Sequence, residues 1–81
     1  MTGRLEGKVA IVTGAGEGIG AAIAYKIGVE GGKVVLAEID AHKGRWREDW
    51  LRKRGIEALH VETDVASEED VKNMVREAVN A

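Results

Sequence analysis

Cysteine and proline are both absent from the 81 residues of this chain. Without cysteine there is no thiol nucleophile, no thiolate zinc site and no disulfide framework, which favours an intracellular location. Without proline, no residue interrupts a helix or strand by lacking a backbone N–H. Aromatic residues make up only 4% of the chain. Because so short a chain buries only about 60% of its unfolded surface, we expect residues 1–81 to form one domain, or half of one, with a marginal core.

The chain also lacks a large excess of charge of one sign, and it has no long apolar run. Twelve basic and fourteen acidic side chains leave a net charge of −2, a poor match for nucleic acid. No apolar run approaches the ~18 residues of a membrane span. The polar opening residues 1–7 do not resemble a signal peptide. We therefore expect a cytoplasmic protein with neither a nucleic-acid nor a membrane partner.

What the chain does have is three short apolar segments that alternate with helical patterns. Strands are expected at residues 8–13, 33–37 and 58–62. After the first strand, apolar residues recur at helical spacing up to Gly31 and Gly32, namely Ile19, Ala22, Ile23 and Ile27. Asp40 can cap a second helix that ends near Gly55. The order βαβαβα is typical of an α/β protein with a parallel sheet.

A third helix is expected to open at Ser67. Asp70 follows three residues later, so the two residues match a capping box. The apolar stripe of this helix is expected to consist of Val71, Met74, Val75, Ala78 and Val79.

These elements predict a Rossmann-like, three-stranded parallel sheet with strand order 3-2-1, an incomplete doubly wound fold. Right-handed crossovers place the first two helices on one face of the sheet and the third on the other. A fourth strand beside the first does not occur before Ala81. We therefore expect the outer edge of the first strand to be unpaired.

Four glycines within seven residues separate the first strand from its helix. Gly14, Gly16, Gly18 and Gly20 let the backbone turn sharply and approach a phosphate without a Cβ in the way. The following helix points free N–H groups at such an anion. The glycines could instead serve only a tight turn, but this loop follows a strand and opens a helix in a βαβ unit, which favours a dinucleotide pyrophosphate.

Residues Thr13 to Gly20 read T-G-x-x-x-G-x-G. With this loop, an acidic residue at the end of the second strand and an Asp-Val pair after the third, the chain resembles the N-terminal part of the short-chain dehydrogenase/reductase family. The resemblance covers essentially all 81 residues and implies a nicotinamide dinucleotide as ligand. The residues that it assigns to cofactor binding are Thr13, Gly14, Gly16, Glu17, Gly18, Ile19, Gly20, Glu38, Ile39, Asp64 and Val65.

Three of these positions bear on the choice between NAD and NADP. Glu38 can accept hydrogen bonds from both adenosine ribose hydroxyls and would repel a 2′-phosphate. By resemblance, Glu17 and Ile39 stand where NADP users of the family often carry a base, and neither is basic. NAD is therefore expected to be preferred over NADP. The alternative reading of Glu38 is a solvated residue at a strand end.

After the third strand, the resemblance assigns the adenine amino group to Asp64 and a backbone contact with the ring to Val65. Asp64 could equally be a turn residue that caps neighbouring N–H groups.

No catalytic residue is expected in this chain. The resemblance implies a Ser, a Tyr-x-x-x-Lys pair and an Asn-Asn-Ala-Gly stretch, and none of these occurs here. The only tyrosine, Tyr25, is followed directly by Lys26 and has Val29 four residues on. We interpret Tyr25 as helix surface.

The histidines, the tryptophans and a basic run carry weaker signals. His42 and His60 lie 18 residues apart without a third ligand at metal spacing, so no metal site is expected and both are read as surface residues. Trp46 and Trp50 lie either at the margin of the core, which we favour, or in an exposed aromatic patch. Six basic residues cluster near the second helix, a pattern typical of a solvated face: Lys43, Arg45, Arg47, Arg52, Lys53 and Arg54.

The leading hypothesis is an NAD-binding portion of a short-chain dehydrogenase/reductase that lacks the catalytic residues. One alternative is an oxidoreductase subunit or fragment that is active only with a missing C-terminal part. Another is an interaction module that binds no nucleotide and uses the tryptophans and the open sheet edge. We also expect the chain to form a homo-oligomer unless the missing half is present.

Overall fold

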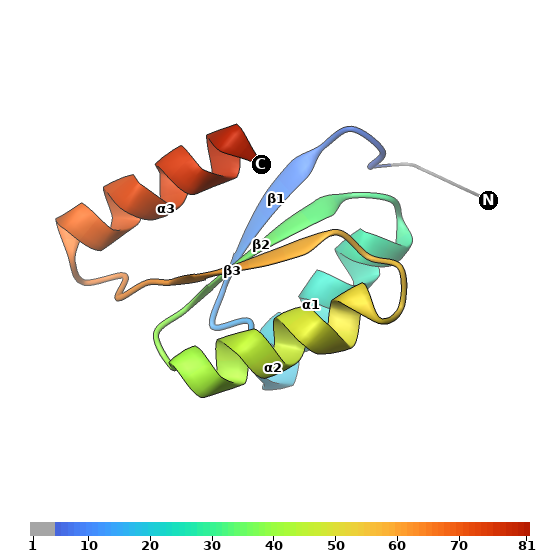
Figure 1. The fold of residues 1–81 in the computed structure, drawn as a ribbon, viewed down its shortest axis with the longest axis horizontal. Coiled ribbons are helices and arrows are strands. Elements are labelled where there is room, and N and C mark those ends of the chain that lie inside the picture. The colour runs from blue at the N-terminus through green and yellow to red at the C-terminus, as the bar shows by residue number, and fades with distance from the viewer. Residues whose placement is uncertain (1–4) are drawn as a thin grey trace.

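A computed structural model describes residues 5–81 as a three-stranded sheet with three helices (Figure 1). The elements in chain order are β1 (Val9–Thr13), α1 (Gly18–Val29), β2 (Lys33–Glu38), α2 (Ala41–Arg52), β3 (Ala58–Glu62) and α3 (Glu68–Asn80). The expected α/β class and the order βαβαβα are confirmed. The boundaries of β3 match the sequence prediction, whereas β2 is one residue longer because Glu38 still pairs with Glu62.

The three strands are parallel and β2 lies between the other two, in the order β1-β2-β3. Read from the opposite edge, this is the order 3-2-1. Ile11 pairs with Val35 in the first ladder, and Val35 pairs with Leu59 in the second. Within residues 5–81, β1 has a neighbour on one side only. Because all strands run the same way, their carboxyl ends meet at one edge of the sheet.

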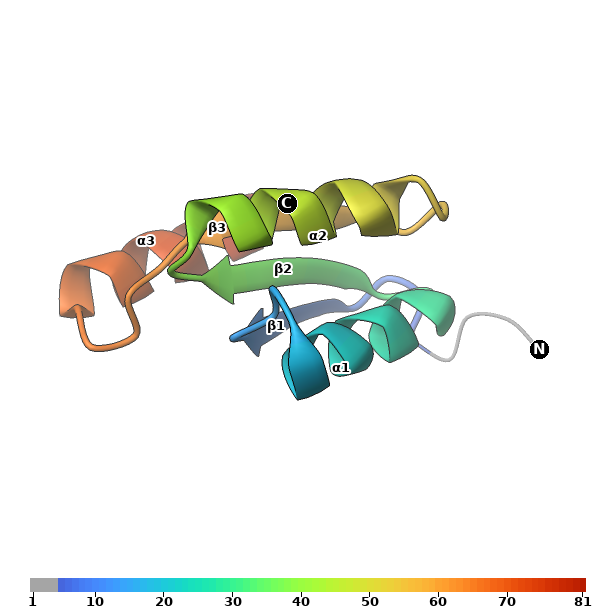
Figure 2. The same cartoon turned by 90° about the horizontal axis from the view of Figure 1, so that it is seen from below.

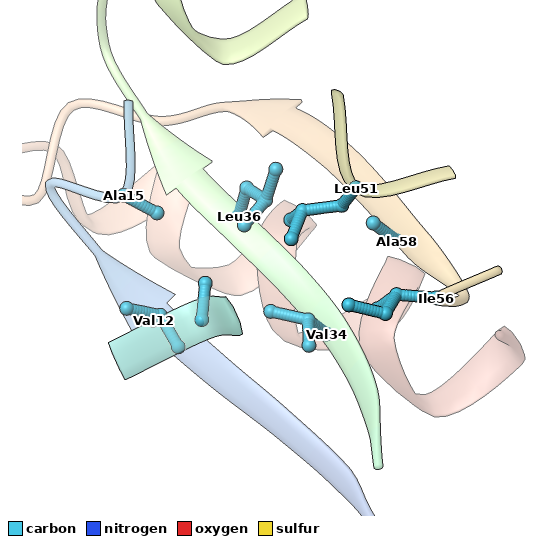
Figure 3. Close-up of a cluster of buried hydrophobic side chains, with 8 residues drawn as sticks. Val12, Ala15, Val34, Leu36, Leu51, Ile56 and Ala58 are labelled. Carbon is cyan, nitrogen blue, oxygen red and sulfur yellow. The ribbon is translucent and has the colours of Figure 1, made fainter. Parts of the chain in front are cut away.

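The helices cover the two faces of the sheet as expected. Figure 2 shows α1 and α2 in front of the sheet and α3 behind it. Five consecutive residues of β2 are buried, from Val34 to Glu38, because the central strand has helices on both faces. Val34 and Leu36 face α1 and α2, where they pack with Leu51 (Figure 3). Val35 and Ala37 face α3, where they pack with Met74 and Ala78.

Helix α1 packs against the sheet mainly through small residues, and of its three isoleucines only Ile27 contacts the core. Ala21 and Ala24 are buried, whereas Ile19 and Ile23 are 81% and 47% exposed. The isoleucine spacing therefore correctly indicated a helix but not its buried face. Where α1 lies closest to the sheet, at Ala21 and Ala24, there is room only for small side chains.

The N-termini of α2 and α3 are capped as the sequence predicts. Asp40 accepts hydrogen bonds from the N–H groups of His42 and Lys43. The Ser67 hydroxyl accepts one from the Asp70 N–H at 3.2 Å. The second half of the expected capping box is missing, because the Asp70 carboxylate accepts from the N–H of Asp64 and not of Ser67.

The expected apolar stripe of α3 is only partly buried. Met74 and Ala78 face the sheet, with Val71 beside them. Val75 and Val79 remain 45% and 78% exposed. The helix thus presents a narrower buried face than the five-residue stripe suggested.

The two tryptophans of α2 lie in different environments. Trp50 packs against the core at its margin, where Tyr25 of α1 meets it edge to face with ring centroids 5.5 Å apart. Trp46 is 59% exposed, and the guanidinium of Arg47 lies 4.8 Å from the centre of its ring. Only Trp50 fits the favoured position at the core margin.

Candidate functional site

The glycine loop lies at the carboxyl edge of the sheet, between the ends of β1 and β2. Gly14 extends the pairing of the two strands by donating its N–H to the Ala37 carbonyl at 3.0 Å. Ala15 and Gly16 are buried against this edge. The loop is therefore held beside the last residue of β2, Glu38.

Two features of the loop require glycine. Gly14 and Gly18 have positive φ angles of 61° and 63°, which L residues with a side chain rarely adopt. A Cβ on Gly20 would collide with the carbonyl oxygen of Gly14. The first turn of α1 can therefore lie directly against the end of β1, which aims the helix axis at the loop.

The N-terminus of α1 has no side-chain cap. Glu17 occupies the N-cap position but accepts no hydrogen bond from the helix, and the first turn contains no acidic residue. This contrasts with α2 and α3, which Asp40 and Ser67 cap. Amide groups at the start of α1 are left free of a carboxylate or hydroxyl partner, which is the arrangement that binds a phosphate.

Glu38 is buried and its carboxylate is held in place by the backbone. Its Oε1 accepts from the Gly16 N–H and its Oε2 from the Asp40 N–H, both at 3.0 Å. Its carbonyl oxygen lies 3.0 Å from His60 Nε2 and accepts from the Thr63 N–H at 3.2 Å. The side chain that the sequence marks as a ribose ligand thus contacts the glycine loop directly, and it is not a freely solvated residue.

His60 is not the surface residue that the sequence suggested. It is half-buried under α2, and its own N–H donates to Glu48 at 2.7 Å. No sequence signal links it to Glu38, 22 residues earlier in the chain.

Two basic residues of α2 reach the glycine loop, and sequence reasoning missed both. Lys43 Nζ forms an ion pair with Glu17 Oε1 at 2.5 Å. Arg47 donates from Nε to the Gly16 carbonyl at 3.4 Å. The hydrogen bond to Glu17 and its negative charge raise the pKa of Lys43 above its usual range. The basic run that we interpreted as a solvated face therefore borders the candidate site with two of its first three residues, Lys43 and Arg47.

Asp40 bounds the site on the side of α2. The hydrogen bond from the Lys43 N–H, followed by that from His42, lowers the pKa of its carboxyl below the usual range. Asp40 therefore keeps its negative charge down to acidic pH while it caps α2.

The remaining predicted residues lie around this edge with fewer contacts. Asp64 accepts the Ala66 N–H on Oδ1 at 2.9 Å, as in the turn that we weighed as its alternative role. Its second carboxylate oxygen has no hydrogen-bond partner among residues 5–81. Val65 and Ile39 are 62% and 58% exposed, and Thr13 ends β1 in an exposed position.

Other features of the described residues lie elsewhere or are missing. A cavity of about 510 Å³ opens at the amino ends of β2 and β3, between Lys33 and Glu57, at the opposite edge of the sheet from the glycine loop. Residues 5–81 contain no cluster of three or more His, Asp or Glu side chains that could hold a metal ion. None of the helices between residues 5 and 81 has the length and hydropathy needed to cross a membrane.

Comparison with known proteins places this geometry in a family. The family model for short chain dehydrogenases matches residues 8–81. An uncharacterized oxidoreductase of Thermotoga maritima is 60% identical over 75 residues, which are 93% of this chain and 29% of that protein.

Solved structures agree with the sequence comparison. A short-chain dehydrogenase/reductase from Burkholderia phymatum in complex with NAD shares 41% identity and a TM-score of 0.91 over 94% of this chain and 27% of its own. A 7α-hydroxysteroid dehydrogenase complexed with NADH shares 35% identity and a TM-score of 0.91 over 95% and 30%. The chain thus spans less than a third of the length of these relatives. With most of its residues matched by the family model, the chain belongs to the short-chain dehydrogenase family.

Proposed function

We propose that this chain binds NAD through the ADP-ribose part of the cofactor and forms the cofactor-binding portion of an oxidoreductase. The observation that carries the proposal is the hydrogen bond between the Gly16 N–H and the Glu38 carboxylate. It sets a ribose acceptor directly beside a glycine loop whose helix has no side-chain cap.

The residues present fit such a ligand. Each carboxylate oxygen of Glu38 accepts one backbone N–H and has a second lone pair for a ribose hydroxyl. The uncapped amides of α1 suit the pyrophosphate, which also gains from the positive end of the helix dipole. The free oxygen of Asp64 suits the adenine amino group, and Val65 and Ile39 can flank the ring with their exposed apolar side chains.

Selectivity for NAD over NADP follows from the same carboxylate. A dianionic 2′-phosphate beside Glu38 should weaken binding by about tenfold or more. Glu17 and Ile39 add no positive charge to the loop or to the end of β2.

Relatives support a nicotinamide dinucleotide as the ligand, since two of the similar structures hold NAD or NADH. Those proteins are more than three times as long as this chain. We propose that residues 1–81 are half of a dinucleotide-binding domain and that hydride transfer requires residues beyond them. The chain alone is then inactive, and an oxidoreductase activity appears only when the rest of such a protein is present.

Calorimetry with NAD, ADP-ribose and NADP tests the binding proposal. ADP-ribose should bind about as well as NAD, because the proposed contacts lie on the adenosine and phosphate side, and NADP should bind worse. Absence of binding by all three would leave an interaction module that binds no nucleotide. Much tighter binding of NAD than of ADP-ribose would reveal a nicotinamide site within these residues.

Variants of Glu38 test its assigned role. Glu38→Ala should narrow the difference between NAD and NADP, and Glu38→Gln should do so while keeping one oxygen acceptor for the backbone. Glu62→Gln is the matched control, because Glu62 pairs with Glu38 at the end of the neighbouring strand but is exposed. Dehydrogenase assays with and without the remaining part of the protein test whether activity depends on it.

A further inference from the structure

The ion pair between Glu17 and Lys43 joins the glycine loop to α2. Of the five ion pairs among residues 5–81, three link residues four apart within or at the end of one helix. A fourth, Lys33 with Glu57, lies at the opposite edge of the sheet. The Glu17 and Lys43 pair alone touches the candidate site, and its two partners are 26 residues apart in the sequence.

Lys43 and Glu38 border the same point of the loop. A Cβ on Gly16 would lie 2.7 Å from the Cβ of Lys43 and 2.8 Å from Oε1 of Glu38. The Lys43 side chain therefore starts beside the carboxylate that, under the proposed function, receives the adenosine ribose. Because its four-carbon stem is flexible, the ammonium can reach more than one nearby anion. In the structure the ammonium pairs with the Glu17 carboxylate.

The local charge follows from this pairing. Three carboxylates border this part of the site together with two cations, so the five groups sum to a charge of −1: Glu17, Glu38, Asp40, Lys43 and Arg47. Were Glu17 neutral, the ammonium would be free for another anion, and the sum would be zero. The nearest additional anion in an NADP complex is the 2′-phosphate, attached to the ribose at Glu38.

We propose that Glu17 keeps the chain selective for NAD by binding Lys43, a cation that otherwise pairs with the 2′-phosphate of NADP. This inference rests on the proposed function, because it takes Glu38 as the ribose acceptor. It assigns selectivity to an ion pair between the loop and α2 in addition to the repulsion by Glu38. Lys43 is then a specificity residue that is held inactive by its partner.

Binding of NAD and NADP to Glu17→Gln, and to Glu17→Gln combined with Lys43→Met, tests the inference. Calorimetry at low ionic strength gives the ratio of the NADP to the NAD dissociation constant. Glu17→Gln should lower this ratio by about tenfold, because Lys43 can then form an ion pair with the 2′-phosphate. The double variant should restore the ratio, because the released cation is gone. Far-UV circular dichroism checks that both variants fold.

Asp49→Asn is the matched control. It also removes one negative charge and frees one lysine, Lys53, which pairs with Asp49 at 2.9 Å. Lys53 lies about 15 Å farther along the helix than Lys43, so this variant should leave the ratio unchanged.

The outcomes separate the two proposals. A low ratio that persists in the double variant would mean that the loss of the Glu17 charge acts without Lys43, and this overturns the inference. An unchanged ratio in Glu17→Gln, with NAD still bound, also overturns it but leaves the proposed function standing. If neither dinucleotide binds the unmodified chain, both proposals fail.

Discussion

The imidazole of His60 on β3 packs directly against Gly44 on α2, where it fills the space that a Cβ would take. Gly44 is buried, and the ring also lies 3.0 Å from the carbonyl oxygen of Glu38 through its Nε2. The contact sets how closely α2 approaches the sheet, and it places the helix that carries Lys43 beside the glycine loop. One glycine in the middle of a helix therefore helps to build the candidate site.

Gly44→Ala should destabilise the fold despite the better helix propensity of alanine. The added methyl group overpacks a tight contact, which typically costs about 1 to 3 kcal/mol. Urea unfolding measures the loss. Adding His60→Ala should recover part of it, because the two sites are coupled through one contact. His42→Ala, at an exposed position on the same helix, should recover nothing. Additive effects of Gly44→Ala and His60→Ala would contradict the proposed packing.

Ser67→Ala should remove the only side-chain cap of α3. The Ser67 hydroxyl accepts from the Asp70 N–H, and loss of such a cap typically costs about 1 kcal/mol. The urea midpoint should fall accordingly. Asn73→Ala, in the exposed face of the same helix, should change the midpoint little. Equal midpoints for both variants would show that the cap adds no stability.

The Asp40 carboxyl should make stability depend on pH in the acid range. Backbone N–H groups of Lys43 and His42 lower its pKa in the folded chain relative to the unfolded chain. The contribution of Asp40 to the free energy of unfolding is therefore fully present above its pKa in the unfolded chain. It is lost as the pH falls through its lower pKa in the folded chain. Asp40→Asn keeps a capping oxygen but cannot ionise.

Unfolding of the parent chain and of Asp40→Asn at several pH values measures this dependence. The parent should lose its higher stability relative to the variant as the pH falls below the usual pKa range of aspartate. Carbon NMR of the Asp40 carboxyl should show a midpoint below that range, and a midpoint at or above it would contradict the prediction.

The parts of the fold that follow from local patterns were predictable. The strand β3, the caps Asp40 and Ser67, and the glycine loop each depend on residues close in the sequence. The buried face of α1 was not predictable, because Ile19 and Ile23 point to solvent and alanines fit the narrow space against the sheet. The contacts of Lys43 with Glu17 and of His60 with Glu38 span 26 and 22 residues. Such pairs depend on how the helices cross the sheet, and no spacing in one sequence reports that.

The outer edge of β1 favours self-association of the chain. Among residues 5–81, β1 pairs only with β2, so its other edge offers free N–H and C=O groups. On the face shared with α3, Val9 and Ile11 are 42% and 41% exposed. An interface of about 1,000 Å² or more over this edge would bury these groups and add stability to a small core.

We therefore expect the 81-residue chain to form homodimers or larger assemblies at micromolar concentration. Sedimentation should show this, and the melting temperature should rise with protein concentration. Ile11→Thr should weaken association, because it replaces apolar surface beside the open edge. Ile19→Thr, at a position 81% exposed on α1, is the matched control and should not. In a protein of the length of its relatives, a segment beyond these residues should cover the edge and suppress the assembly. A cooperative monomer whose melting temperature does not change with concentration would refute the prediction.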